Sequence, residues 1–389
     1  MMRDLLRILR YHPRAAVGDG GMTGAIRRWS EALSLAGASV TIGYEEGEPP
    51  IDPGPTRWVP IGHRTIGPLK LPVDIDRYLR DVDLLVLHSG WTAHNLRAAA
   101  IARSLGVPYL LEPRGAYDPH ILRRNENLKR LWWQAAEHTL VDRSMAIHAF
   151  FEDERSHLAA LEYEGPVIVV PNGVQTPDGL RWSGAASGYL LWLGRFDPEH
   201  KGLDLLVDAV ASLAPAQRPT IRLHGPDWRG GKRKTAERIA RHDLGRWLLV
   251  GPPVYGPEKQ RLLAEAAAFL YPSRWDACPN AVLEAVSIGV PTLCTPYPLG
   301  AYLGHRGGSV LAEASVSGLA RALLELRDRD RMAAIGATGA ALARSDFRWA
   351  SVAERWLDQV EACLGGSQPH GMQSTRQAEL QRRSMSSGT

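Results

Sequence analysis

The alternation of short apolar runs with helical segments constrains the fold of this chain more than any other feature. Each run is bounded by glycine, proline or polar residues, as expected of strands buried in a sheet. In the first half they are Leu5–Tyr11, Ser39–Gly43, Leu84–His88, Val107–Glu112, Met145–Phe150 and Pro166–Val170. In the second half they are Tyr189–Gly194, Thr220–His224, Trp247–Gly251, Ala266–Tyr271 and Pro291–Thr295. Strands joined by helices through short links predict an α/β fold with doubly wound parallel sheets.

The alternation divides the chain into two units. A chain of 389 residues is too long for one ordinary core. The pattern stops in the polar segment 171–188 and then starts again. We expect Rossmann-like domains at 1–175 and 176–345, with a hinge near residue 175. The predicted C-terminal parts are a helix over 346–364 that crosses back to the first domain and a disordered tail over 365–389.

Composition excludes several classes of protein. A formal charge of +4 is only mildly basic, so it gives no support to nucleic-acid binding. No apolar run is long enough to span a bilayer, and the charged first ten residues do not resemble a signal peptide. Cys278, Cys294 and Cys363 have no metal-binding spacing, and their odd number leaves one unpaired. A reducing cytoplasm is the expected location.

The segment Ser273–Ala285 carries the clearest chemical signal. It follows a predicted buried strand, and Asn280 is placed to cap a helix that ends at Gly289. Asp276 and Glu284 stand on either side of this helix start, whose free N–H groups favour anions. Carboxylates beside such an end can accept hydrogen bonds from sugar hydroxyls, which predicts a nucleotide-sugar site. The simpler interpretation is a surface aspartate and a helical glutamate.

Arg195 and Lys201 follow another predicted strand in the same half of the chain. Ligands of doubly wound sheets bind at the carboxyl ends of strands, where two cations can neutralise a diphosphate. The alternative is a pair of solvated surface cations. The presence of Asp276 and Glu284 in the same predicted domain favours the phosphate site.

The glycine-rich loop near the N-terminus has two interpretations. Its glycines Gly18, Gly20 and Gly24 resemble a dinucleotide fingerprint. Six residues separate the strand from Gly18, however, which is too long for the tight turn of that motif. Gly20 and Gly21 would instead let backbone N–H groups approach a phosphate from the facing domain.

A reductase is therefore disfavoured. Tyr255 and Lys259 have the spacing of a reductase Tyr/Lys pair, but Pro257 lies between them. We interpret this spacing as coincidence.

Three polar residues, His88, Arg114 and Asp118, lie at or after strand ends in the first half. We expect them to face the cleft between the domains. The alternative for each is a structural role, as is usual for a histidine at a strand end.

A basic and aromatic segment spans residues 123–133 and includes Lys129, Arg130, Trp132 and Trp133. Such a composition suits an anionic membrane surface. A solvated helix with buried tryptophans explains it equally well.

Taken together, these residues resemble glycosyltransferase family 4 over about residues 5–364. The most specific part is an acid, seven residues and a second acid, here Asp276 and Glu284, followed by Gly289-Val290-Pro291. Arg195 and Lys201 match the cations that the family places on the donor diphosphate.

The resemblance implies a GT-B fold, a nucleotide-sugar in the cleft between the domains, retention at the anomeric carbon, and no metal or other cofactor. It implies Glu284 on the ribose, Asp276 on the donor sugar, Gly21 at the diphosphate, and Gly251 to Val254 near the base. The helix start at Asn280-Ala281 would also hold the diphosphate.

Two positions depart from the family pattern. The first acid is usually glutamate, and Asp276 is one methylene shorter. The family often has a histidine in a Pro-His-Gly context where this chain has Pro113-Arg114-Gly115. Arginine at this position resembles members that build exopolysaccharide and lipopolysaccharide on lipid carriers.

We therefore expect a retaining, metal-independent hexosyltransferase of cell-surface polysaccharide biosynthesis, cytoplasmic or at the inner face of the plasma membrane. Its acceptor would be a glycan or a lipid-linked glycan. The alternative is a non-catalytic relative that binds a sugar nucleotide or a partner glycosyltransferase as a scaffold. The pair Arg195 and Lys201 disfavours a scaffold, because a scaffold needs no leaving-group stabilisation.

Overall fold

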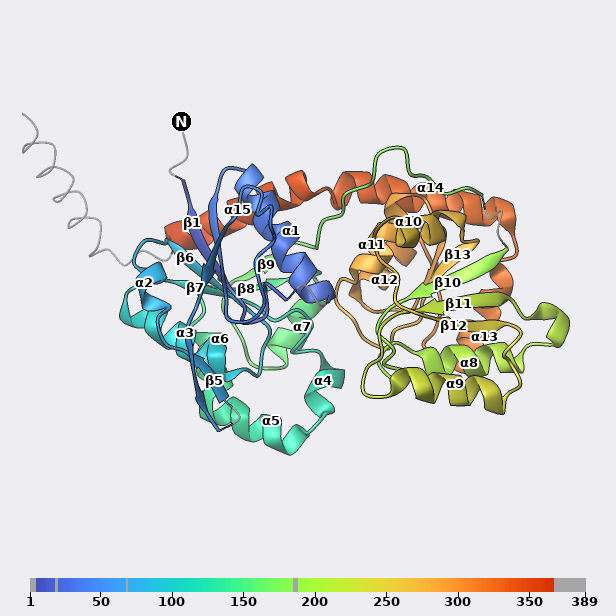
Figure 1. Ribbon diagram of the computed structural model, residues 1–389, viewed down its shortest axis with the longest axis horizontal. Coiled ribbons are helices and arrows are strands. Elements are labelled where there is room, and N and C mark those ends of the chain that lie inside the picture. The colour runs from blue at the N-terminus through green and yellow to red at the C-terminus, as the bar shows by residue number, and fades with distance from the viewer. Residues whose placement is uncertain (1–4, 18–19, 68, 185–187, 367–389) are drawn as a thin grey trace, which may run out of the picture.

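The computed structural model describes residues 5–17, 20–67, 69–184 and 188–366 of the chain. Two α/β units lie side by side, and each has its own sheet (Figure 1). Both sheets are parallel throughout, so the predicted pair of doubly wound domains is confirmed. The predicted tail lies outside the described residues apart from 365 and 366, which belong to the last helix.

The first sheet has the order β3-β2-β1-β6-β7-β8-β9. Its strands are β1 (Arg7–Tyr11), β2 (Ser39–Tyr44), β3 (Arg57–Pro60), β6 (Leu84–His88), β7 (Tyr109–Glu112), β8 (Ala146–Ala149) and β9 (Val167–Val169). The helices of this unit are α1 (Gly21–Leu35), α2 (Asp76–Leu79), α3 (Ala93–Ser104), α4 (Pro119–Arg123), α5 (Glu126–Trp132), α6 (His138–Asp142) and α7 (Glu154–Ala159). A π-helical turn, Trp133–Glu137, joins α5 to α6, and an antiparallel hairpin of β4 (His63–Ile66) and β5 (Leu69–Pro72) projects from the sheet.

The second sheet has the order β12-β11-β10-β13-β14-β15. Its strands are β10 (Tyr189–Leu193), β11 (Thr220–His224), β12 (Leu248–Gly251), β13 (Ala268–Tyr271), β14 (Thr292–Cys294) and β15 (Val310–Leu311). The helices are α8 (Leu203–Ser212), a short 3-10 turn at Pro215–Gln217, α9 (Gly231–Arg241), α10 (Gly256–Glu265), α11 (Asn280–Ser287), α12 (Pro298–His305), α13 (Val316–Glu325) and α14 (Arg329–Asp346).

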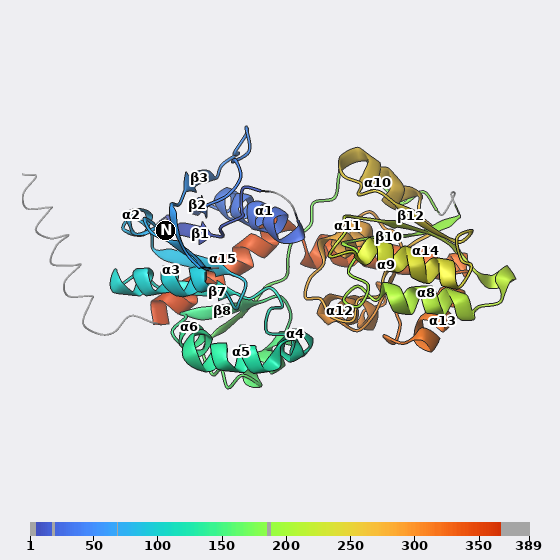
Figure 2. The ribbon, with the colours of Figure 1, turned by 60° about the horizontal axis from the view of Figure 1, so that its bottom comes forward.

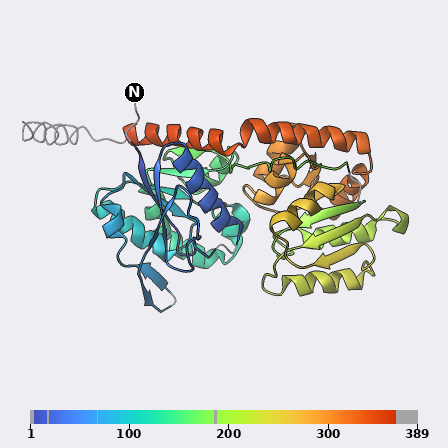
Figure 3. The ribbon, with the colours of Figure 1, turned by 45° about the horizontal axis from the view of Figure 1, so that its top comes forward.

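The last helix, α15 (Trp349–Gly366), lies along the first sheet although it follows the second one in sequence. Figure 3 shows α14 and α15 end to end along one edge of the molecule, α14 on the second unit and α15 on the first. Trp356 of α15 is fully buried beside Trp29 of α1, with ring centroids 6.2 Å apart. This apolar packing gives the two units a second connection besides the segment 170–188.

The first helix begins earlier than the sequence predicts. We expected the glycines up to Gly24 to lie in a loop, but α1 starts at Gly21, with Gly20 at the N-cap position. The Thr23 hydroxyl donates to the Gly20 carbonyl and accepts the Gly20 N–H, which closes the first turn. Gly21 and Gly24 are thus helical, and Gly18 lies outside the described residues. The glycines form the N-terminus of a helix rather than an open loop.

Candidate functional site

The two units face each other across a cavity of about 190 Å³. Figure 2 shows α4 of the first unit on the side that faces α12 of the second. The first unit contributes Met22, Ser89, Pro113, Arg114, Gly115, Ala116, Asp118, Ile121, Glu154 and His157 to the wall of the cavity. The second unit contributes His200, Trp275, Asp276, Ala277 and Pro298. Arg114, Asp118 and Asp276, which the sequence placed at a cleft, therefore meet at one cavity.

The N-termini of α1 and α11 meet beside this cavity. Asn280 is the first helical residue of α11 and Pro279 holds the cap position, so the prediction that Asn280 caps the helix is wrong. The Asn280 side chain instead donates from Nδ2 to the carbonyl of Gly21, at 3.1 Å. A Cβ on Gly21 would lie 4.0 Å from that nitrogen. The free N–H groups of two helices thus come together, as an anion site requires.

The predicted cation Lys201 lies close to Asp276 because α8 begins against the end of β13. Gly202, the N-cap of α8, has a left-handed φ of 64°, and a Cβ there would lie 1.9 Å from the Pro272 carbonyl oxygen. Only glycine fits this approach, which brings the preceding residue over the strand end.

The Lys201 ammonium has two oxygen partners. Its Nζ lies 2.5 Å from Asp276 Oδ2 and 2.8 Å from the Tyr271 hydroxyl. Burial by itself would raise the pKa of Asp276, but the charge of Lys201 and the hydrogen bonds from Lys201 and Tyr271 together outweigh burial, and the pKa is lowered. The Asp276 carboxyl group is therefore ionised at neutral pH.

Arg195 does not line the cavity but lies next to His200, which does, and it is less tightly held than Lys201. Its guanidinium is 4.3 Å from the centroid of the Trp228 ring and 3.8 Å from Asp197 Oδ2. Its Nε is buried and has no hydrogen-bond partner among the described residues. His200 lies between the two cations, 3.4 Å from each, and burial lowers the pKa of its imidazole. A neutral His200 adds no positive charge to the repulsion between Arg195 and Lys201.

A stack of three rings joins the two units at the cavity. Trp275 lies between His200 of its own unit, at 4.7 Å and 4°, and His120 of α4, at 5.3 Å and 11°. Asp118 holds His120 by accepting its backbone N–H at 2.8 Å. Trp275, the residue that precedes Asp276 in the sequence, thus contacts the first unit directly.

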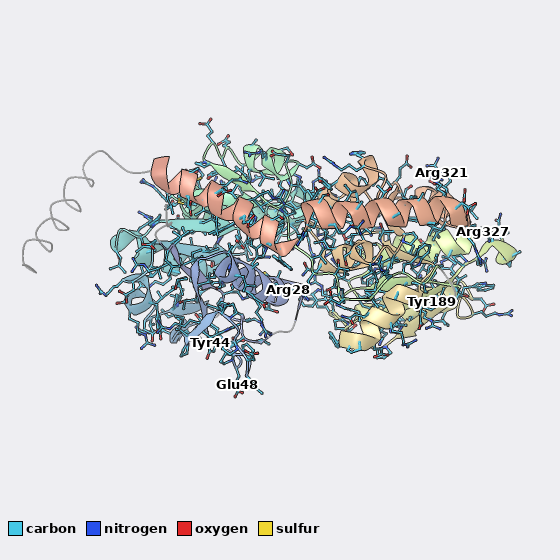
Figure 4. All side chains as sticks on the ribbon, turned by 90° about the horizontal axis from the view of Figure 1, so that it is seen from above. Arg28, Tyr44, Glu48, Tyr189, Arg321 and Arg327 are labelled. Atoms are coloured by element: carbon cyan, nitrogen blue, oxygen red, sulfur yellow. The ribbon has the colours of Figure 1, made fainter. Side chains whose placement is uncertain are left out.

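Glu284 lies on α11 with two cations around its carboxylate. Lys259 of α10 is 2.7 Å from Oε2, and Arg28 of α1 is 3.6 Å from Oε1. Figure 4 shows Arg28 at the boundary between the two units. Lys259, which the sequence linked only to a coincidental Tyr/Lys spacing, therefore contacts a predicted site residue.

The first unit holds a buried charged row under α1. Glu112 of β7 is fully buried and accepts hydrogen bonds from Arg10, at 3.0 Å, and from Arg114, at 2.8 Å. His88 Nδ1 and His148 Nδ1 lie 2.9 and 3.1 Å from its two oxygens. Burial opposes ionisation of Glu112, but Arg10, His88 and Arg114 hold its pKa well below the ordinary value. Glu112 is the central counter-ion of the row.

His88 does not face the cleft as the sequence predicted. Its ring is fully buried, and it is absent from the wall of the cavity. Period-2 alternation along β6 places it on the sheet face covered by α1, with Leu84 and Val86. Burial lowers the pKa of His88 well below the ordinary value, so it is neutral.

Arg114 and Asp118 do line the cavity. Arg114 has a left-handed φ of 54°, an uncommon conformation for a residue with a side chain. Glu154 shares this wall, and burial raises the pKa of its carboxyl group to about 7, even though the backbone N–H groups of Phe150 and Phe151 donate to it.

The remaining predicted residues stand near helix starts. Val254 is buried in the core one residue before the cap of α10, and Ala281 is the second residue of α11. His200, Trp275, Tyr271 and Glu112 were not predicted as site residues. A signal existed for His200 and Trp275, since each is adjacent in sequence to a predicted residue. Tyr271 and Glu112 lie in apolar runs that predict strands, so the sequence indicates a place in the hydrophobic core and not in a site.

The basic and aromatic segment forms α5 and the π-helical turn. Trp132 and Trp133 are half-buried, and Trp132 Nε1 donates to Glu137 at 2.9 Å. Leu128 and Leu131 are exposed to 64% each. The tryptophans therefore serve packing, while leucines occupy the exposed surface.

No set of three or more metal-ligating side chains gathers within residues 5–17, 20–67, 69–184 and 188–366. Over the same ranges, no helix combines the length and apolarity needed to cross a bilayer.

Two sequence-family profiles match the chain, and together they span most of it. Residues 20–173 match a glycosyl transferase 4-like domain, and residues 187–329 match glycosyl transferases group 1. The chain belongs to the group 1 glycosyltransferases. The expected family resemblance is thus confirmed; the first profile covers the first sheet except β1, and the second covers the second sheet.

Solved glycosyltransferase structures share the fold of this chain. Sucrose-phosphate synthase from Thermosynechococcus elongatus matches with a TM-score of 0.73 at 15% identity, covering 93% of this chain and 100% of that chain. Anabaena HepE in complex with UDP-glucose gives 0.73 at 16% identity, with 92% and 100% covered. WaaG, a glycosyltransferase involved in lipopolysaccharide biosynthesis, gives 0.64 at 14% identity, with 91% and 99% covered. These identities establish the GT-B fold alone. No curated protein matches the sequence.

Proposed function

We propose that this glycosyltransferase moves a sugar, with retention of anomeric configuration and without a metal, from a nucleotide-sugar to a glycan or lipid-linked glycan. The observation that carries the proposal is the cavity between the sheets. Arg114 lines this cavity, and further anion-binding groups lie next to its wall: Lys201 contacts Asp276, and the N-termini of α1 and α11 meet at Gly21 and Asn280. A diphosphate joined to a sugar is the ligand that such a site suits.

The donor contacts are distributed over both units. Arg195 and Lys201 would bind the diphosphate, together with N–H groups near Gly21 and Asn280. Glu284 would accept the ribose hydroxyls, and the base would lie near residues 251–254, after β12.

Catalysis in this proposal is electrostatic. Two cations and two helix N-termini stabilise the charge that develops on the departing diphosphate. The leaving phosphate takes the acceptor proton on the face from which it departs, which retains the configuration. Arg114 would hydrogen-bond the donor sugar or phosphate, Asp118 would contact substrate from the same wall, and closure of the units would exclude water.

The Anabaena HepE structure contains UDP-glucose, which makes UDP-sugars the first donors to test. WaaG is described as a lipopolysaccharide enzyme, which agrees with a cell-surface acceptor. We place the reaction in the cytoplasm, at the inner face of the plasma membrane.

The surface of α4 and α5 supports a peripheral contact with an anionic membrane. Arg123, Arg124 and Arg130 are exposed there, beside the exposed Leu128 and Leu131. Sedimentation with vesicles of phosphatidylglycerol and phosphatidylcholine tests this contact. Replacing Arg124 and Arg130 by glutamate should reduce binding to these vesicles. Equal vesicle binding by the wild type and this double variant would contradict the proposed membrane contact.

A screen of UDP-, GDP- and ADP-sugars tests the function. We expect a donor-dependent rise in melting temperature and release of nucleoside diphosphate. A lack of response to every donor would refute the proposal. Binding without turnover, over a broad panel of glycan acceptors, would favour the scaffold instead.

A further inference from the structure

The hydroxyl of Tyr271 is a buried polar group that the proposed mechanism leaves without a role. Tyr271 ends β13 and is 5% exposed. Its hydroxyl donates to Asp276 Oδ2 at 3.0 Å and accepts from Lys201 Nζ at 2.8 Å. With the Lys201–Asp276 pair, these contacts form a closed triangle of a phenol, a carboxylate and an ammonium.

We propose that Tyr271 is a positioning residue which, with Asp276, fixes the ammonium of Lys201 where the donor diphosphate binds. The inference rests on the proposed function and adds a residue to it. It also changes the role of Asp276, which the family resemblance had assigned to donor-sugar hydroxyls.

The carboxylate of Asp276 is already occupied. Oδ2 accepts from both Lys201 and Tyr271, and Oδ1 accepts the N–H of Ala277 at 3.1 Å. A carboxylate engaged in this way holds its cation rather than a sugar. The ring of Tyr271 adds to the hold, because its centroid lies 5.1 Å from Lys201 Nζ.

Asp276 offers the ammonium a single oxygen, which explains why a phenol is needed. Its Oδ2 contacts Lys201, whereas its Oδ1 accepts the N–H of Ala277. A glutamate at this position would reach one methylene further toward the ammonium. The Tyr271 hydroxyl, at the end of β13, supplies the second oxygen ligand of the Lys201 ammonium.

A neighbouring tyrosine shows that burial alone does not create this contact. Tyr297 packs against Tyr271 with ring centroids 5.8 Å apart and is equally buried. Its hydroxyl contacts the buried thiol of Cys294 and makes no hydrogen bond to Lys201 or Asp276. Tyr297→Phe is therefore a matched control for Tyr271→Phe, since both remove one buried hydroxyl.

The first measurement needs no ligand. The full chain is treated with an amine-acylating reagent, and the rate at Lys201 is followed by peptide mass spectrometry relative to exposed Lys234. We expect Tyr271→Phe to raise the Lys201 rate several-fold and Tyr297→Phe to leave it unchanged. Asp276→Glu in the Tyr271→Phe background should restore the slow rate. Asp276→Asn is a second variant that should also raise the acylation rate of Lys201.

The second measurement is calorimetric titration with inorganic pyrophosphate. Loss of one hydrogen bond to a charged group should weaken binding about tenfold in Tyr271→Phe. Tyr297→Phe should bind pyrophosphate as tightly as the wild type does. Adding Asp276→Glu to Tyr271→Phe should recover the lost affinity.

Two results would overturn the inference. One is an unchanged Lys201 acylation rate in folded Tyr271→Phe, and the other is no recovery with Asp276→Glu. If the wild type binds no pyrophosphate, the donor site itself fails, while the acylation rates still decide whether Tyr271 holds Lys201. The two failures are therefore distinguishable.

Discussion

Each sheet carries a charged cluster at the carboxyl ends of its strands, and the two clusters are built in opposite ways. In the first, Glu112 is fully buried and is surrounded by Arg10, Arg114 and two histidines. In the second, Lys201 and Arg195 lie beside the cavity, and Arg195 keeps a side chain that is 39% exposed. A central acid under a helix stabilises the fold, whereas cations at an open cavity can bind a ligand.

The largest effect should follow from Lys201→Ala. Removal of one group that stabilises the leaving diphosphate should lower kcat by about 10²- to 10³-fold. Some loss of melting temperature should accompany it, because the Asp276 carboxylate then loses its nearly buried cation. Release of nucleoside diphosphate measures kcat, and exposed Lys234→Ala serves as the control. An equal loss of kcat in Lys201→Ala and Lys234→Ala would show that the second cluster has no special role in the reaction.

Glu112→Gln should act on stability instead. Removing one partner of a buried charged network should cost about 3–5 kcal/mol in the free energy of unfolding, measured by urea titration. The exposed Glu126→Gln, which breaks only a surface pair with Arg130, should change it by less than about 1 kcal/mol. Similar values for the two variants would show that the row is not structural.

The same variant should change the pH dependence of stability. The pKa of Glu112 is lower in the folded than in the unfolded chain, so its contribution is present above the ordinary value of 4.5. The contribution is lost as the pH falls through the folded-state pKa. The stability gap between wild type and Glu112→Gln should therefore narrow below pH 4.5, and a gap that widens in acid would contradict this sign.

Glu284→Ala should have a smaller and selective effect. If Glu284 binds the ribose, the affinity for the responding nucleoside diphosphate should fall about tenfold. The affinity for pyrophosphate should stay unchanged, because pyrophosphate has no ribose. Calorimetric titration with the nucleoside diphosphate and with pyrophosphate measures both affinities. An equal loss of affinity for the two ligands would assign Glu284 to the diphosphate instead of the ribose.

Arg28→Ala should have the smallest effect. Arg28 is 47% exposed and lies 3.6 Å from Glu284, so the pair between the units is worth less than about 1 kcal/mol. Nucleotide affinity should change by less than about threefold at physiological salt. A larger loss would show that Arg28 contacts the donor itself.

The sequence predicted the central strands of both sheets, but it missed the edge strands β3 and β15, the β4–β5 hairpin and several helices. Strands of a parallel sheet are buried on both faces, so they read as continuous apolar runs. Several helices of the second unit do not show an apolar pattern. Helix α9 is rich in lysine and arginine, α10 begins with glycine and proline, and α12 contains two glycines. These helices were missed because tertiary packing rather than local preference forms them.

The site was partly predictable for a related reason. Arg195, Lys201 and Asp276 follow strand ends, where a doubly wound sheet binds ligands. The contact of His120 with Trp275 joins positions far apart in sequence and had no local signal. His88 was misplaced because its position at a strand end does not reveal which face of the sheet it occupies.

Whether a donor site lies at this cavity is decided by calorimetric titration of UDP, GDP and ADP into the wild type and Lys201→Ala. We expect at least one nucleotide to bind the wild type and to bind Lys201→Ala at least about tenfold more weakly. Equal binding by both proteins, or binding by neither, would contradict a donor site at this cavity.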